Sequence, residues 1–214
     1  MATFTADQVW ACAAAAHRIN GGYVKEIQYG TKDGMLDTSV VLKDANKNIV
    51  KKWLRENDFA HLTEADYAAG QKARDHFKSY TLLMIAGKLN EFQQTAYKIA
   101  TKDEFTGRDM YDFAVVSCLP SVAERDSARS ELKKEIYASE QLAGNIGDQI
   151  ISDITVINCR FNPNFNKHRV TARMGDSFVD FWFARELRGD LRIRAKIKFH
   201  RDDKTTALNY VKVL

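Results

Sequence analysis

Apolar residues in the first two thirds of the chain recur at intervals of three and four, the spacing typical of amphipathic helices. One such run consists of Ala73, Phe77, Tyr80 and Met84. Residues that cap helix N-termini precede four of these runs, at Thr5, Thr63, Asn90 and Ser121. This part of the chain is therefore expected to be mainly helical, with short strands near residues 23–29 and 38–42.

After Gly147 the spacing of apolar residues changes to two, which indicates strands. Five strands within about 65 residues suit a small antiparallel barrel or curled sheet. We therefore predict an α+β chain with a mainly helical N-terminal body over residues 1–147 and a small antiparallel barrel over residues 148–214. The alternation predicts a barrel core that includes Val170, Ile193, Ile197 and Val211.

Composition narrows the class of protein. Hydrophobic residues make up 45% of the 214 residues and charged residues 28%, which are globular proportions. The longest uncharged apolar run, residues 9–16, is far shorter than the roughly 20 residues that cross a bilayer. Three widely separated cysteines suggest a reducing compartment. The expectation is a cytoplasmic protein without a membrane partner.

Charge is distributed unevenly along the chain. Residues 150–214 contain 13 Lys and Arg against 7 Asp and Glu, whereas the preceding residues contain 19 against 21. A basic C-terminal third beside a mildly acidic body is typical of proteins that bind a polyanion.

The most basic segment is a single predicted strand. Its alternation places five side chains on one face: Arg192, Arg194, Lys196, Lys198 and His200. Like charges about 7 Å apart along a strand repel one another, and a phosphate backbone would offset that repulsion. Arg169 and Arg173 are expected to form a second basic row on a neighbouring strand. Among the many aromatic residues nearby, two or three are expected at the surface, and Trp182 is the candidate for stacking on a base.

Two other interpretations of this strand stay open. It could be an ordinary solvated face whose charge is balanced by Asp180, Glu186 and Asp190. It could also dock on the acidic surface of another protein.

Enzymatic signatures are missing from the sequence. The five histidines are scattered, no Cys-x-x-Cys pair occurs, and neither of the common glycine-rich phosphate-binding motifs is present. Asp180, Glu186 and Asp190 lack the spacing of a metal-dependent nuclease. We therefore expect no catalytic residue, no metal site and no cofactor.

The end of the chain resembles a known group of proteins. Residues 195–200 read Ala-Lys-Ile-Lys-Phe-His and residues 206–212 read Thr-Ala-Leu-Asn-Tyr-Val-Lys. This pair of segments is similar to the closing strands of small single-stranded-DNA-binding-like proteins in the DNA metabolism of tailed bacteriophages. Residues 89–92 and 117–120 are similar to upstream pieces of such proteins. The resemblance implies an OB-like C-terminal fold, a role in phage DNA replication or recombination, and the host cytoplasm as the location.

The sequence as a whole predicts a non-enzymatic protein that binds nucleic acid, preferentially single-stranded DNA. The alternative is a phage protein–protein interaction module, either a virion component or an inhibitor of a host defence complex. The helical body offers a further surface on which a protein partner could bind.

Overall fold

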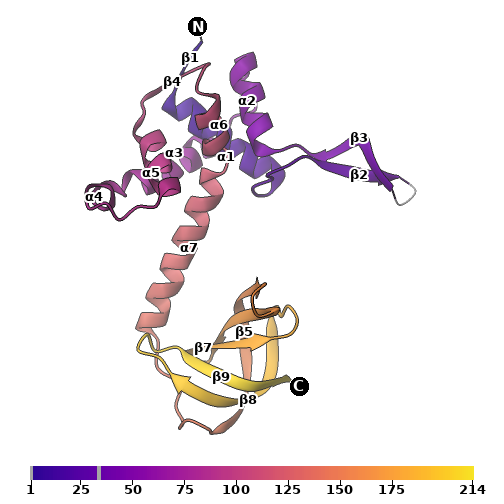
Figure 1. Ribbon diagram of the computed structural model, residues 1–214, viewed down its shortest axis with the longest axis vertical. Coiled ribbons are helices and arrows are strands. Elements are labelled where there is room, and N and C mark those ends of the chain that lie inside the picture. The colour runs from indigo at the N-terminus through magenta and orange to yellow at the C-terminus, as the bar shows by residue number, and fades with distance from the viewer. Residues whose placement is uncertain (1, 33–34) are drawn as a thin grey trace. The chain divides into compact units, whose positions relative to one another are not determined.

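The computed structural model describes residues 2–32 and 35–214 (Figure 1). The chain forms two compact units, Met1–Ala128 and Arg129–Leu214. The division lies within helix α7 (Leu119–Ala138), whereas the change in apolar spacing suggested a boundary after Gly147. Both helices and strands are present, so the α+β class is confirmed.

Unit 1 is a mixed body rather than a purely helical one. Its helices are α1 (Ala6–Asn20), α2 (Asn46–Glu56), α3 (Glu64–Lys78), α4 (Thr81–Ile85), α5 (Glu91–Thr101), α6 (Met110–Val116) and the start of α7. Its strands form two antiparallel pairs, β1 (Thr3–Thr5) with β4 (Glu104–Thr106) and β2 (Gln28–Lys32) with β3 (Met35–Lys43). In the described residues, no helix has both the length and the apolar character that a bilayer crossing needs.

Three of the four predicted helix starts are confirmed. Thr5, Thr63 and Asn90 each accept the amide of the residue three positions later, and the side chain of that residue accepts the cap amide in return. The predicted start at Ser121 is wrong, because α7 already begins at Leu119. Pro120 fits in the first turn of α7 since that position needs no amide donor.

Unit 1 is built around α1, which is buried on all sides over residues 9–16. Five of these eight residues are alanines, whose small side chains let neighbouring helices approach closely. Helix α3 approaches α1 closely at Gly70. A Cβ atom at Gly70 would lie 2.6 Å from the carbonyl carbon of Trp10 and 2.8 Å from the amide nitrogen of Ala11.

Replacing Gly70 with alanine is therefore expected to destabilise unit 1 by about 1–3 kcal/mol. Alanine would gain about 1 kcal/mol of helix propensity, but its methyl group would collide with backbone that cannot rotate away. Thermal unfolding followed by circular dichroism at 222 nm would measure the loss. Gly107→Ala is the control, because its added Cβ would lie 4.0 Å from the carbonyl oxygen of Ala2 and would not collide with it. Equal melting temperatures for wild type and Gly70→Ala would contradict the close packing of α1 on α3.

Unit 2 is a closed five-stranded barrel preceded by the end of α7. Its strands are β5 (Gln149–Asn162), β6 (Lys167–Met174), β7 (Ser177–Phe183), β8 (Asp190–His200) and β9 (Thr206–Val213). They follow one another around the barrel in the order β5-β6-β7-β9-β8, and β8 closes on β5. All neighbours are antiparallel except β7 and β9, which run parallel.

The interior of the barrel is filled by alternating apolar residues, as the strand pattern predicted. Val170, Ile193 and Ile197 are buried there, and the half-buried Val211 packs against them. The core residues predicted for the C-terminal portion are thereby confirmed. Because alternate residues point inward, the residues between them must line the outer surface of the barrel.

Candidate nucleic-acid interface

The cations of β8 point outward from the barrel. Ile193, Ala195 and Ile197 are almost completely buried in the core. The four residues that alternate with them therefore lie on the outside: Arg192, Arg194, Lys196 and Lys198. The predicted phase of this strand is correct up to Lys198, where a register shift between Ile197 and Phe199 interrupts the alternation, and Phe199 is not among the residues of the barrel core.

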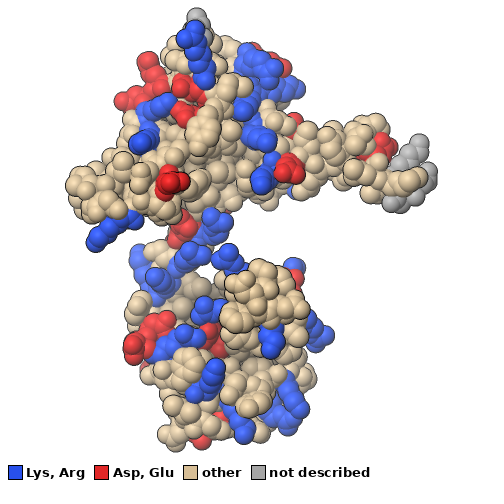
Figure 2. Space-filling model, viewed as in Figure 1, with Lys and Arg blue, Asp and Glu red and all other residues tan. Residues whose placement is uncertain are grey.

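Strand β9 adds a fifth cation that sequence reasoning did not include. Lys212 pairs with Arg194 across the antiparallel ladder, so both side chains are on the same outer surface. We call the five residues Arg192, Arg194, Lys196, Lys198 and Lys212 the basic face. Figure 2 shows Lys and Arg side chains outnumbering Asp and Glu on the visible side of the barrel.

Few carboxylates accompany the basic face. Asp153 of β5 lies 4.0 Å from Arg192, and both side chains are largely exposed, so the pair contributes little. Within the described part of the chain, no carboxylate oxygen comes within 4 Å of the side-chain nitrogens of the other four cations. Their mutual repulsion is therefore not relieved by ion pairs inside the protein.

The three carboxylates considered as balancing charges are bound elsewhere. Asp180 accepts hydrogen bonds from Arg169 and Arg201. Glu186 pairs with Arg188 at 2.8 Å. Asp190 accepts a hydrogen bond of 2.6 Å from the hydroxyl of Thr155. The interpretation of β8 as a face balanced by these residues does not fit the contacts.

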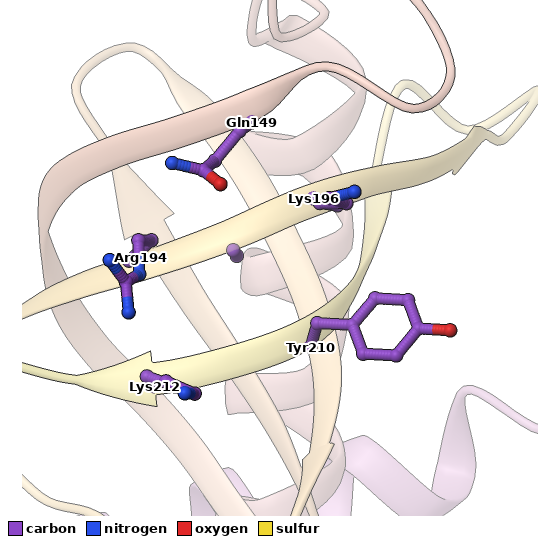
Figure 3. Close-up of a pocket in the computed structure, with 6 residues that line it drawn as sticks. Gln149, Arg194, Lys196, Tyr210 and Lys212 are labelled. Carbon is purple, nitrogen blue, oxygen red and sulfur yellow. The ribbon is translucent and has the colours of Figure 1, made fainter.

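A shallow recess of about 320 Å³ lies on the basic face. The residues that line it come from three adjacent strands: Gln149, Arg194, Ala195, Lys196, Tyr210 and Lys212 (Figure 3). The ring of Tyr210 projects from β9 beside the strand that carries Arg194 and Lys196. Tyr210 is 77% exposed, which is unusual for so large an aromatic residue.

His200 is the last residue of β8, and its side chain contacts other residues of unit 2. Its Nδ1 atom is 2.9 Å from the hydroxyl of Thr206, and its Nε2 atom is 3.0 Å from the carbonyl oxygen of Gly144. Both ring nitrogens thus have protein partners. This histidine connects β8 to β9 and to the segment before β5.

Arg169 and Arg173 do not form a second row beside β8. They lie on β6, whose neighbours are β5 and β7, so the predicted adjacency of the two basic strands is wrong. Arg169 pairs with Asp180 at 3.0 Å and Arg173 with Glu135 at 2.6 Å. Their charges are therefore already partly compensated.

Trp182 belongs to a separate aromatic face on the β5, β6 and β7 side of the barrel. It is 42% exposed and packs against Phe165 with ring centroids 5.1 Å apart. Arg169 pairs with Trp182 across β6 and β7, and Arg160 pairs with Arg169 across β5 and β6. We call Arg160, Phe165, Arg169 and Trp182 the aromatic face.

Four aromatic residues of the barrel are exposed, more than the two or three expected: Phe161, Phe165, Trp182 and Tyr210.

Side-chain contacts connect the aromatic face to the basic face. Asp180 holds Arg169 on one side and, at 2.9 Å, Arg201 on the other. The guanidinium of Arg201 lies 5.0 Å from the centre of the Phe199 ring, and the Lys198 amine lies 5.6 Å from it. Cationic and aromatic groups thus continue around the barrel between the two faces.

The two cysteines of unit 1 are poor nucleophiles. Burial raises the pKa of Cys12 to about 12 and also raises the pKa of Cys118, so both stay protonated near neutral pH. Among the described residues, no three His, Cys, Asp or Glu side chains gather where they could hold a metal ion. The geometry favours binding of an anionic polymer on the outside of the barrel.

Comparison with known proteins adds no residue to this site. Searches of protein-family models, curated proteins and solved structures found no match to the chain.

Proposed function

We propose that unit 2 is an OB-like barrel that binds single-stranded DNA without catalysing a reaction. The observation that carries the proposal is the basic face: five outward cations on two paired strands, four of them without a carboxylate within 4 Å among the described residues. The strand order and the one parallel pair support the OB-like assignment. Barrels of that kind commonly bind oligonucleotides.

A phosphate backbone matches the chemistry of this face. Lys and Arg side chains that neutralise phosphates displace the small cations condensed on the nucleic acid, and the release of these ions favours binding at low salt. Exposed rings on the same barrel can stack on bases, and only a single strand presents its bases for stacking. Together these two features favour a single strand over a duplex.

The biological setting that we propose is phage DNA replication or recombination. The resemblance of residues 195–200 and 206–212 to the closing strands of phage single-stranded-DNA-binding-like proteins supports it. Those segments lie within β8 and β9, the two strands that carry the basic face.

A salt titration tests the proposal. Binding of a fluorescent oligothymidylate of about 20 nucleotides would be followed by anisotropy at several salt concentrations. Four or five neutralised phosphates predict a slope of log affinity against log salt of roughly −3 to −3.5. A duplex of equal length is expected to bind more weakly.

The same titration separates the alternative function. A face built to dock on an acidic protein surface would show little affinity for the oligonucleotide even at low salt. That outcome, or an affinity that does not change with salt, would contradict the proposal of DNA binding.

A further inference from the structure

Tyr210 has a backbone conformation that is rarely adopted by a large residue. Its φ angle is +51°, in the left-handed region. The other non-glycine residues with positive φ in the described chain are Asn57, Asn166 and Lys204, all in turns or at a helix end. Tyr210 is the only one of these four that lies within a strand. Left-handed backbone in a bulky residue persists only where the surrounding structure enforces it.

A β-bulge enforces the conformation of Tyr210. Arg194 pairs with Lys212 and Lys196 pairs with Asn209, so two residues of β9, Tyr210 and Val211, oppose Ala195 alone. The bulge turns Val211 toward the barrel core and Tyr210 away from it. Packing of the barrel core does not require a tyrosine at position 210, because Tyr210 is 77% exposed.

The ring is placed where a bound strand would expose its bases. Three cations of the basic face line the recess next to it, together with the Gln149 side chain (Figure 3). Phosphates on Arg194, Lys196 and Lys212 would bring the attached bases within reach of the ring. The amide of Gln149 offers both a donor and an acceptor for a base edge.

We propose that Tyr210 is a base-stacking residue that makes the basic face selective for single strands. This inference rests on the proposed function of unit 2. A free phosphate or polyphosphate would use the cations but would gain nothing from the ring. Bases of a duplex are already stacked on one another and would not gain from it either.

Tyr210→Gly is the informative variant because it separates stability from binding. Glycine adopts positive φ without strain, so the melting temperature of the barrel is expected to be equal to that of wild type or a few degrees higher. Loss of the stacking ring is expected to weaken binding of the labelled oligothymidylate about 5- to 100-fold. The salt slope should stay the same, because no cation is removed.

Three comparisons complete the experiment. Tyr210→Phe keeps the ring and should bind the oligonucleotide within about twofold of wild type. Tyr210→Asn tolerates the backbone conformation without a ring and should behave like Tyr210→Gly. Inorganic polyphosphate, used as a competitor, should be bound equally by wild type and by Tyr210→Gly.

The outcomes distinguish this inference from the proposed function. If wild type fails to bind the oligonucleotide, the proposed function itself is wrong. If wild type binds and Tyr210→Gly binds within twofold of it, only the stacking role is overturned. A Tyr210→Gly protein that melts well below wild type would instead show that the ring supports the fold, which also overturns the inference.

Discussion

Changing Arg194 and Lys198 together to alanine is expected to reduce the salt slope of single-stranded DNA binding by about 1.4, since each phosphate contact contributes about 0.7. Both side chains lie on the outer surface of β8 without a carboxylate partner among the described residues. Their loss should therefore leave the fold intact while removing two phosphate contacts. Binding should weaken for all sequences alike, because phosphate contacts carry no base information.

A charge-matched control separates local contacts from net charge. Lys133 and Arg188 are exposed cations of unit 2 outside the basic face. Changing both to alanine removes the same two charges and should alter the slope by much less. Wild-type affinity of the Arg194/Lys198 variant at low salt would show that the basic face is not the binding site.

Replacing Ile197 with aspartate is expected to unfold the barrel. Ile197 is 1% exposed and belongs to the barrel core. Its neighbours there are apolar, so the new carboxylate would have no partner, and burying it would cost several kcal/mol. A cost of that size is a large part of the stability of a small barrel. Loss of the near-ultraviolet circular dichroism signal of the barrel aromatics, or its melting at lower temperature, would measure the effect.

Ile151→Asp is the matched control for this substitution. Ile151 lies on β5, pairs with Arg194 across the ladder, and is 53% exposed. The same chemical change on the outer surface should alter stability by about 0.5 kcal/mol or less. An Ile197→Asp protein as stable as Ile151→Asp would mean that Ile197 does not face the barrel core.

The local features of this fold follow from short stretches of sequence. A threonine or asparagine with the right residue three positions later marks the starts of α1, α3 and α5. Alternation over residues 191–198 shows which side chains of β8 point inward, because the side-chain period of a strand is two. The four cations of β8 could for this reason be placed on the outer surface from sequence alone.

The arrangement of strands around the barrel does not follow from such patterns. Alternation tells which side of a strand faces the core, but it carries no information about which strand lies next to it. The cations of β6 were for that reason expected beside β8, although β5 lies between them on one side. The ion pairs of Arg169 and Arg173 could not be predicted from sequence either, because their partners Asp180 and Glu135 lie on other elements of the chain.

The bulge at Tyr210 did leave a signal in the sequence. The inward residues of β9 are Leu208, Val211 and Val213, so the first interval is three instead of two. An extra residue between two inward positions is the mark of a bulge. The signal was weak because it contains no glycine, the residue that usually indicates positive φ.

The short parallel pairing of β7 with β9 is the weakest strand pairing of the barrel. Only two residue pairs join these strands, Val179 with Thr206 and Asp180 with Ala207. The carboxylate of Asp180 lies at this pairing and accepts a hydrogen bond from Arg201, which precedes β9. Asp180 is held by both Arg169 and Arg201, and removing one of these two cations from a buried carboxylate is costly. The pair with Arg201 therefore resists local opening where backbone hydrogen bonds are few. Transient separation of the barrel should therefore begin at β7 and β9 once Arg201 is drawn away from Asp180, for example by a passing phosphate.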